Sequence, residues 1–265
     1  MNVTMDHLPL FGVFLASVIV TLLATELGVR LATWRKGKLA EGESVATRTA
    51  AAASLSLLGF MLAMAFGAAA SRYHELKNVT LEEANAIGTT FVRVDLLPQS
   101  DRAEIRQLLY DYVTLQVDIT QAGAERRDES NRRRSDALQQ DLWSRAVALA
   151  EQEPTPISAL FVQALNELID MRAKRLTLGL HYRLPESIWL VLGALTVLAM
   201  AMAGYEIGVS GGRRVIATTL LGGMAFSAVL TFVVALDRHD HRVSSDAHIA
   251  LFNLQKEMHR SMQPH

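Results

Sequence analysis

The polar segment 72–95 holds the densest group of side chains suited to acid–base or ion-binding chemistry. Two carboxylates, an amide and two flanking arginines share one helical pattern: Arg72, Glu82, Glu83, Asn85 and Arg93. Glu83 lies beside the apolar positions of this pattern, where a buried carboxylate needs a cationic partner. Arg72 and Arg93 are the candidates considered for that role. The cluster predicts either a structural ion pair or a ligand site.

Three further charged residues lie where apolar stretches end: Glu26, Arg30 and Glu206. A charge inside a bilayer usually marks a functional site. Glu26 precedes Arg30 by four residues, which is the spacing of an ion pair on a helix. Two interpretations stay open for these glutamates, a structural pair at the membrane edge or a path for ions or protons.

Metal-ligand residue types gather near the C-terminus, in the stretch "DRHDH". Asp237, His239 and His241 are possible metal ligands, but the favoured interpretation is a solvated tail next to the membrane. We predict no metal and no other cofactor. The chain has no cysteine, phosphate-binding glycine loop, nucleophile elbow or helical HExxH pattern, so we predict no enzyme activity.

Four uncharged stretches are long enough to cross a membrane, and a helix that crosses one requires about 20 apolar residues. They are Leu8–Thr25, Thr49–Ser71, Ser187–Tyr205 and Val215–Leu236. Half of all residues are hydrophobic and only 20% are charged, with a net charge of −1. We therefore expect membrane lipid as a partner and no nucleic acid.

The spans form two hairpins around a polar insertion, and every segment shows helical periodicity. We expect hairpins at 1–71 and 185–236, a soluble domain at 72–184 and a polar tail at 237–265. The predicted fold is an all-α integral membrane protein with four transmembrane helices and an inserted helical bundle.

Two details of the polar insertion and the tail follow from the same periodicity. The apolar pattern of the second span continues to Leu97 without a breaker, so that span should continue as one long soluble helix. The charged run 124–136 should separate two helices of the bundle. The amphipathic stretch 249–260 should dock on the domain or at the membrane interface.

Small residues recur on one face of the second span. With one bulky neighbour, Phe66, they are Ala52, Ser56, Gly59, Ala63, Gly67 and Ala70. Such a face permits close packing between membrane helices. The alternative is that the face lines a pore across a ring of subunits, with Phe66 as an apolar constriction.

The two hairpins also resemble each other in sequence. The first span ends with "TELGVR" (25–30) and the third with "YEIGVS" (205–210). Either an internal duplication or chance similarity between membrane helices explains the match.

Basic residues indicate the orientation of the spans. The turn after the first span and the turn between the last two spans are both rich in lysine and arginine. Basic short loops favour the cytoplasm. The N-terminus, the helical domain and the tail are then expected outside it.

Several motifs together resemble a known family. The acidic helix "EEANAIGT" (82–89) follows the first hairpin, "LLP" (96–98) precedes "RAEIRQLLYDYV" (102–113), and "LDR" (236–238) follows the last span. Over roughly residues 8–240, the chain is similar to bacterial membrane proteins with a bestrophin-like domain.

This resemblance implies a function. Bestrophins are pentameric anion channels whose second span lines the pore, so the resemblance implies a homo-oligomer, small anions as permeants and residues 52–70 facing the axis. It also implies the bacterial inner membrane. The expectation of a periplasmic helical domain comes from the basic turns and not from the resemblance. The alternative function is a non-transporting sensor or scaffold whose helical domain binds a partner.

Overall fold

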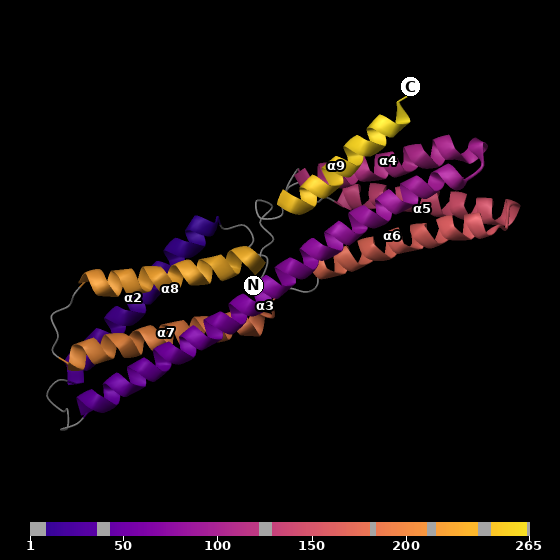
Figure 1. Ribbon diagram of the computed structural model, residues 1–265. Coiled ribbons are helices and arrows are strands. Elements are labelled where there is room, and N and C mark those ends of the chain that lie inside the picture. The colour runs from indigo at the N-terminus through magenta and orange to yellow at the C-terminus, as the bar shows by residue number, and fades with distance from the viewer. Residues whose placement is uncertain are drawn as a thin grey trace. The chain divides into compact units, whose positions relative to one another are not determined.

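The structure is a computed structural model that describes residues 9–35, 43–121, 129–180, 184–210, 216–237 and 245–263. All regular elements among these residues are helical, as predicted (Figure 1). The helices, in chain order, are α2 (Leu10–Arg35), α3 (Glu43–Arg93), the 3-10 helix η1 (Val94–Leu96), α4 (Gln99–Gln121), α5 (Glu129–Gln152), α6 (Pro156–Leu180), α7 (Glu186–Val209), α8 (Ile216–Asp237) and α9 (Ser245–Met262).

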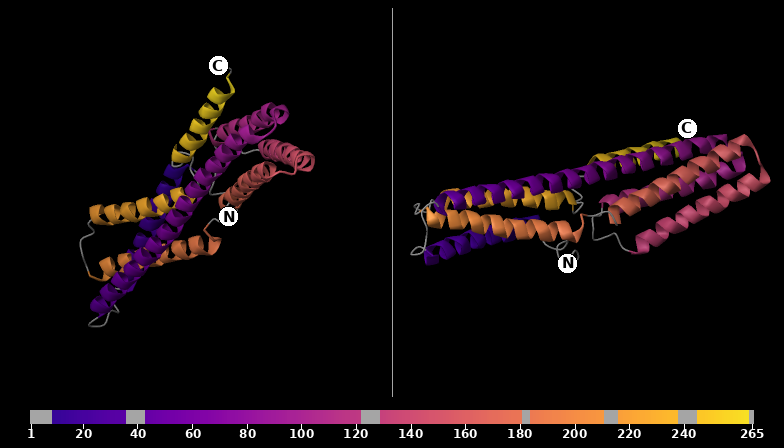
Figure 2. Two further views of the ribbon diagram at one scale, coloured as in Figure 1. Left: turned by 45° about the vertical axis from the view of Figure 1, so that its right-hand side comes forward. Right: turned by 90° about the horizontal axis from the view of Figure 1, so that it is seen from below.

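The helices pack into two units, each with its own core (Figure 2). The first, here called the membrane unit, contains α2, α7, α8 and residues 43–72 of α3. The second, the helical domain, contains α4, α5, α6, α9 and residues 73–93 of α3. Each unit therefore provides its own positions for functional side chains.

Three helices of the described residues are long and apolar enough to cross a membrane. They are Leu10–Arg35, Val45–Leu96 and Glu186–Val209. The predicted fourth span coincides with α8, whose described apolar part, Leu221–Asp237, is shorter. The fold class of an all-helical membrane protein is confirmed, and the fourth span stays a prediction.

Glycines set the close crossing of α2 and α7 in the membrane unit. A Cβ built on Gly28 would overlap the carbonyl oxygen of Ala201, and one on Gly204 would overlap that of Thr25. Gly208 likewise faces α2. Backbones can approach this closely in lipid only where side chains are absent. The glycines shared by "TELGVR" and "YEIGVS" both lie in this contact.

The second predicted span does continue as one helix. α3 runs for 51 residues, and α-helical geometry ends at Arg93 with the turn η1. Leu97 is extended, with ψ of 164°, because the following Pro98 disfavours helical geometry in the residue before it. The α-helix therefore ends four residues before the predicted Leu97.

The core of the helical domain is built from one face of each helix. Tyr112, Phe161 and Leu168 are fully buried in it. Leu251 and Met258 of α9 belong to the same core, so the predicted docking of this amphipathic helix on the domain is confirmed.

The charged run 124–136 forms less of a separator than expected. α5 already begins at Glu129 and includes the three consecutive arginines of this run. Glu129 and Arg133 form an i,i+4 ion pair at 3.4 Å, and Ser135 is buried. Two helices, α4 and α5, are thus separate as predicted, but α5 starts within the run because charged residues extend a helix when they line its solvent face.

Candidate functional site

The small-residue face of α3 points away from the core of its own unit. Its exposed members are Ala52, Ser56, Gly59, Ala63 and Gly67, while Ala70 is half-buried. No described atom lies within 4 Å of a Cβ built on either glycine. The opposite face packs inside the unit through Ala51, Leu58, Leu62, Ala65 and Ala69. Among the described residues, packing within the unit therefore uses the other face and leaves most of the small-residue face exposed.

Phe66 contacts α8. Its ring stacks on Phe232, with centroids 5.8 Å apart and planes 24° apart, and remains 39% exposed. A rotation of this side chain would have to break that stacking contact, which favours a fixed position for the ring.

The glutamates at the membrane edge each have a cationic partner. Arg30 Nε donates to Glu26 Oε1 at 2.9 Å, at the predicted i,i+4 spacing. Glu206 accepts from Ser210 Oγ at 2.9 Å and lies 3.5 Å from Arg48 Nε. These contacts favour structural pairing, and a path for ions through either residue stays a prediction.

Arg72, the first member of the predicted polar cluster, belongs to the membrane unit. Its Nη1 donates to the backbone oxygen and to the carboxylate of Asp237, at 3.0 and 2.9 Å. The same carboxylate accepts the backbone N–H of Leu184 at 3.1 Å. Both charged side chains are 10% exposed. This junction joins α3, the approach to α7 and the end of α8.

The junction also includes one of the candidate metal ligands of the tail. Asp237 is engaged with Arg72, whereas His239 and His241 lie outside the described residues. Within the described part of the chain, no group of three suitable ligands comes together.

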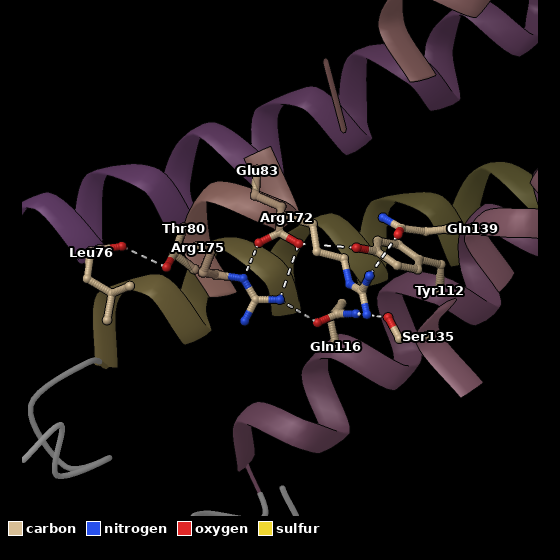
Figure 3. A network of polar contacts seen from close by, with 9 residues as sticks. All are labelled: Leu76, Thr80, Glu83, Tyr112, Gln116, Ser135, Gln139, Arg172 and Arg175. Atoms are coloured by element: carbon tan, nitrogen blue, oxygen red, sulfur yellow. Dashed lines mark hydrogen bonds and ion pairs between the residues drawn. The ribbon is translucent and has the colours of Figure 1, made fainter. Parts of the chain in front are cut away.

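Glu83 occupies the centre of a buried polar network in the helical domain (Figure 3). Its side chain is 1% exposed and pairs with Arg175 of α6, whose Nε and Nη2 both donate to it. Tyr112 of α4 donates its hydroxyl to Glu83 at 3.2 Å. The expectation of Arg72 or Arg93 as partner was wrong, because packing brings α6 against α3.

The network extends from Arg175 into α4 and α5. Arg175 Nη2 donates to Gln116 Oε1 at 2.7 Å, and Gln116 Nε2 donates to Ser135 Oγ at 2.9 Å (Figure 3). Gln116 thus accepts a hydrogen bond through its amide oxygen and donates one through its amide nitrogen. Four helices are thereby joined through one buried carboxylate.

A second buried arginine lies one helical turn away on α6. Arg172 donates to Gln139 Oε1 at 2.8 Å and pairs with Asp136 at 2.7 Å. The Nε2 of Gln139 is buried and has no hydrogen-bond partner among the described residues. A buried donor of this kind commonly binds an ordered water.

The surroundings shift the pKa values of two groups in the network, Tyr112 and Arg175. Burial, reinforced by the charge of Glu83, raises the pKa of Tyr112 far above its ordinary value. Burial opposes the charge of Arg175, but the Glu83 carboxylate outweighs it and raises the pKa of Arg175. Tyr112 therefore stays a neutral donor and Arg175 a cation, which favours a structural ion pair over proton transfer.

The remaining cluster members lie apart from Glu83. Glu82 is exposed and 3.9 Å from Lys174, and Asn85 is exposed. Arg93 donates to the backbone oxygen of Leu160 at 2.7 Å. The predicted cluster thus divides into separate contacts.

The partners of Glu83 that α4 and α6 supply were not predicted from the sequence. Arg172 and Arg175 interrupt the apolar face that Leu165 and Leu168 begin on α6. A basic pair on the buried face of a helix is a signal that buried acidic partners lie elsewhere.

Comparison with known proteins gives two matches. The family model described as a bestrophin-like domain matches residues 15–239. A crystal structure of a bacterial bestrophin homologue from Klebsiella pneumoniae, solved as a point mutant, is similar in fold, with a TM-score of 0.56 and 14% sequence identity. The likeness covers 94% of this chain and 98% of that one. No curated protein matches the sequence.

Proposed function

This chain belongs to the bestrophin-like family, and from that premise we propose that it is a homo-oligomeric membrane channel for passive ion flow. In the ring, the α3 helix of each subunit turns its small-residue face toward the central axis. Small anions are the permeant class that the family resemblance implies. Five subunits are the expected number on the same basis. The glutamates at the membrane edge serve as structural pairs beside this pathway.

One observation carries the proposal. The small-residue face of α3 is exposed, although it is the face best suited to close helix contact. Around Gly59 and Gly67 the chain itself leaves open space. A ring of subunits would use this face for an apolar pathway narrow enough to control wetting.

The first test is the native mass of the full chain in mild detergent, followed by ion flux in vesicles. We expect a ring of four to six subunits that conducts. Gly59→Leu and Ala63→Leu should keep the ring and lower flux at least about tenfold, because added bulk narrows an apolar constriction.

Gly193→Leu is the matched control, since Gly193 also has open space around it but lies on α7. It should leave flux within about twofold. A monomer or dimer would contradict the channel and favour a sensor or scaffold whose helical domain binds a partner. A ring without flux would reject the channel but retain the oligomer.

We further propose that the protein lies in the bacterial inner membrane with its helical domain in the periplasm. The basic residues of the two short turns support this orientation. Because the chain has no cysteine, single cysteines report sidedness directly. Asp141→Cys should react with a membrane-impermeant maleimide in spheroplasts, and Lys38→Cys should react only after lysis. The reverse pattern would place the domain in the cytoplasm.

A further inference from the structure

Two arginines from different helices meet consecutive residues near the end of α7. Arg35 of α2 donates from Nη1 to the hydroxyl oxygen of Tyr205 at 3.5 Å. Arg48 of α3 donates from Nε to Glu206 at 3.5 Å, and Ser210 donates to the same oxygen at 2.9 Å. All five residues belong to the membrane unit. The ends of α2 and α7 and the start of α3 lie together at one corner of that unit (Figure 1).

The glycine crossing of α2 and α7 explains why these side chains converge. Gly204 and Gly208 of α7 pack directly on α2, so Tyr205 and Glu206 lie level with its last turns. Arg35, the last residue of α2, then reaches Tyr205. The crossing therefore positions Arg35 beside Tyr205, and Arg48 reaches Glu206 from the first turns of α3.

Most hydrogen-bond donors of the cluster remain available. Tyr205 accepts from Arg35, and among the described residues its own hydroxyl proton has no acceptor. Arg48 uses only Nε within that same part of the chain, which leaves both Nη groups, and its side chain is 73% exposed. The two Nη groups of a guanidinium can donate two parallel hydrogen bonds to two oxygens of one phosphate.

Neighbouring residues place the cluster at the level of lipid headgroups. Trp34, next to Arg35, is 86% exposed, and it ends an exposed apolar stripe on α2 that includes Leu23, Leu27 and Leu31. Tryptophan at the end of such a stripe is typical of the membrane–water interface. Exposed arginines at this level meet phosphate groups.

We propose that Arg35, Arg48 and Tyr205 bind the phosphate of an anionic phospholipid. Two arginines and one glutamate, Glu206, leave one net positive charge, which matches the single negative charge of a lipid such as phosphatidylglycerol. A zwitterionic lipid brings an ammonium group that this charge repels. The site fixes a lipid where α2, α3 and α7 meet, independently of whether the protein conducts ions.

The test is native mass spectrometry of the full-length protein in detergent, titrated with phosphatidylglycerol. Arg48→Gln should weaken binding about tenfold, because it removes a charged donor. Tyr205→Phe should weaken it about fivefold without changing any charge, through loss of one hydroxyl donor. Phosphatidylcholine should bind more weakly than phosphatidylglycerol to the unmodified protein.

Arg30→Gln is the matched control. Like Arg48, Arg30 is an exposed arginine paired with a glutamate, but it lies on α2 outside the proposed site, and its side chain is 76% exposed. It should change affinity less than about twofold. Equal losses for Arg30→Gln and Arg48→Gln, with no effect of Tyr205→Phe, would overturn the site in favour of general surface attraction. Displacement of the lipid by millimolar inorganic phosphate would make free phosphate the ligand. Circular dichroism and elution volume of each variant verify folding.

Discussion

Gly204→Leu is expected to prevent stable folding of the membrane unit, with a loss of about 3 kcal/mol or more in the free energy of unfolding. Gly204 faces the backbone of α2, and a Cβ there would lie 3.0 Å from the Cα of Thr25 and overlap its carbonyl oxygen. Backbone atoms cannot rotate away as a side chain can. The measurement is the unfolding of the full chain, with every variant in the same detergent and with circular dichroism as the probe of unfolding.

Gly193→Leu on the same helix supplies the control. No described atom lies within 4 Å of a Cβ built there, so its stability should change by less than about 0.5 kcal/mol. Gly204→Ala should fall between the two. Similar stability for Gly204→Leu and Gly193→Leu would show that α2 and α7 do not cross closely.

Glu83→Gln is expected to destabilise the helical domain by about 3–5 kcal/mol, since it leaves the charge of Arg175 largely buried without its carboxylate. Glu83 is 1% exposed and Arg175 is 20% exposed, so solvent compensates little. Hydrogen exchange of the α4 and α6 amides in the full-length protein measures the effect as faster exchange.

Two further variants separate this pair from general charge effects. Glu82→Gln removes a neighbouring carboxylate that is 54% exposed and should cost less than about 1 kcal/mol. The double variant Glu83→Gln with Arg175→Gln should be more stable, by about 2 kcal/mol, than the sum of the single losses predicts. Additive losses would mean that the two charges do not interact.

The elements of this fold were largely predictable because their signals are local. Uncharged length indicated the membrane helices, and the absence of proline between Pro9 and Pro98 indicated the continuous α3. Amphipathic spacing likewise indicated that α9 docks on the domain or at the membrane interface, and the structure shows it on the domain. Each of these features depends on one continuous stretch of sequence and not on partners far along the chain.

The site was less predictable because its partners are distant in sequence. Glu83 and Arg175 are 92 residues apart, and only the packing of α6 on α3 brings them together. Arg72 and Arg93 are closer along the chain, but helix rotation and distance separate them from Glu83. Knowing that a buried carboxylate needs a cation does not identify which helix supplies it.

The glycine crossing has a consequence for synthesis of the protein. Arg35 and Tyr205, which it brings together, are separated by 170 residues. At roughly 5–20 residues per second, the ribosome needs on the order of 10–30 s to synthesise this part of the chain. During this interval the face of α2 at Gly28 has no α7 to pack against, so the contact forms only after the later helix has been made. Insertion of this chain is therefore a two-stage process with a built-in delay.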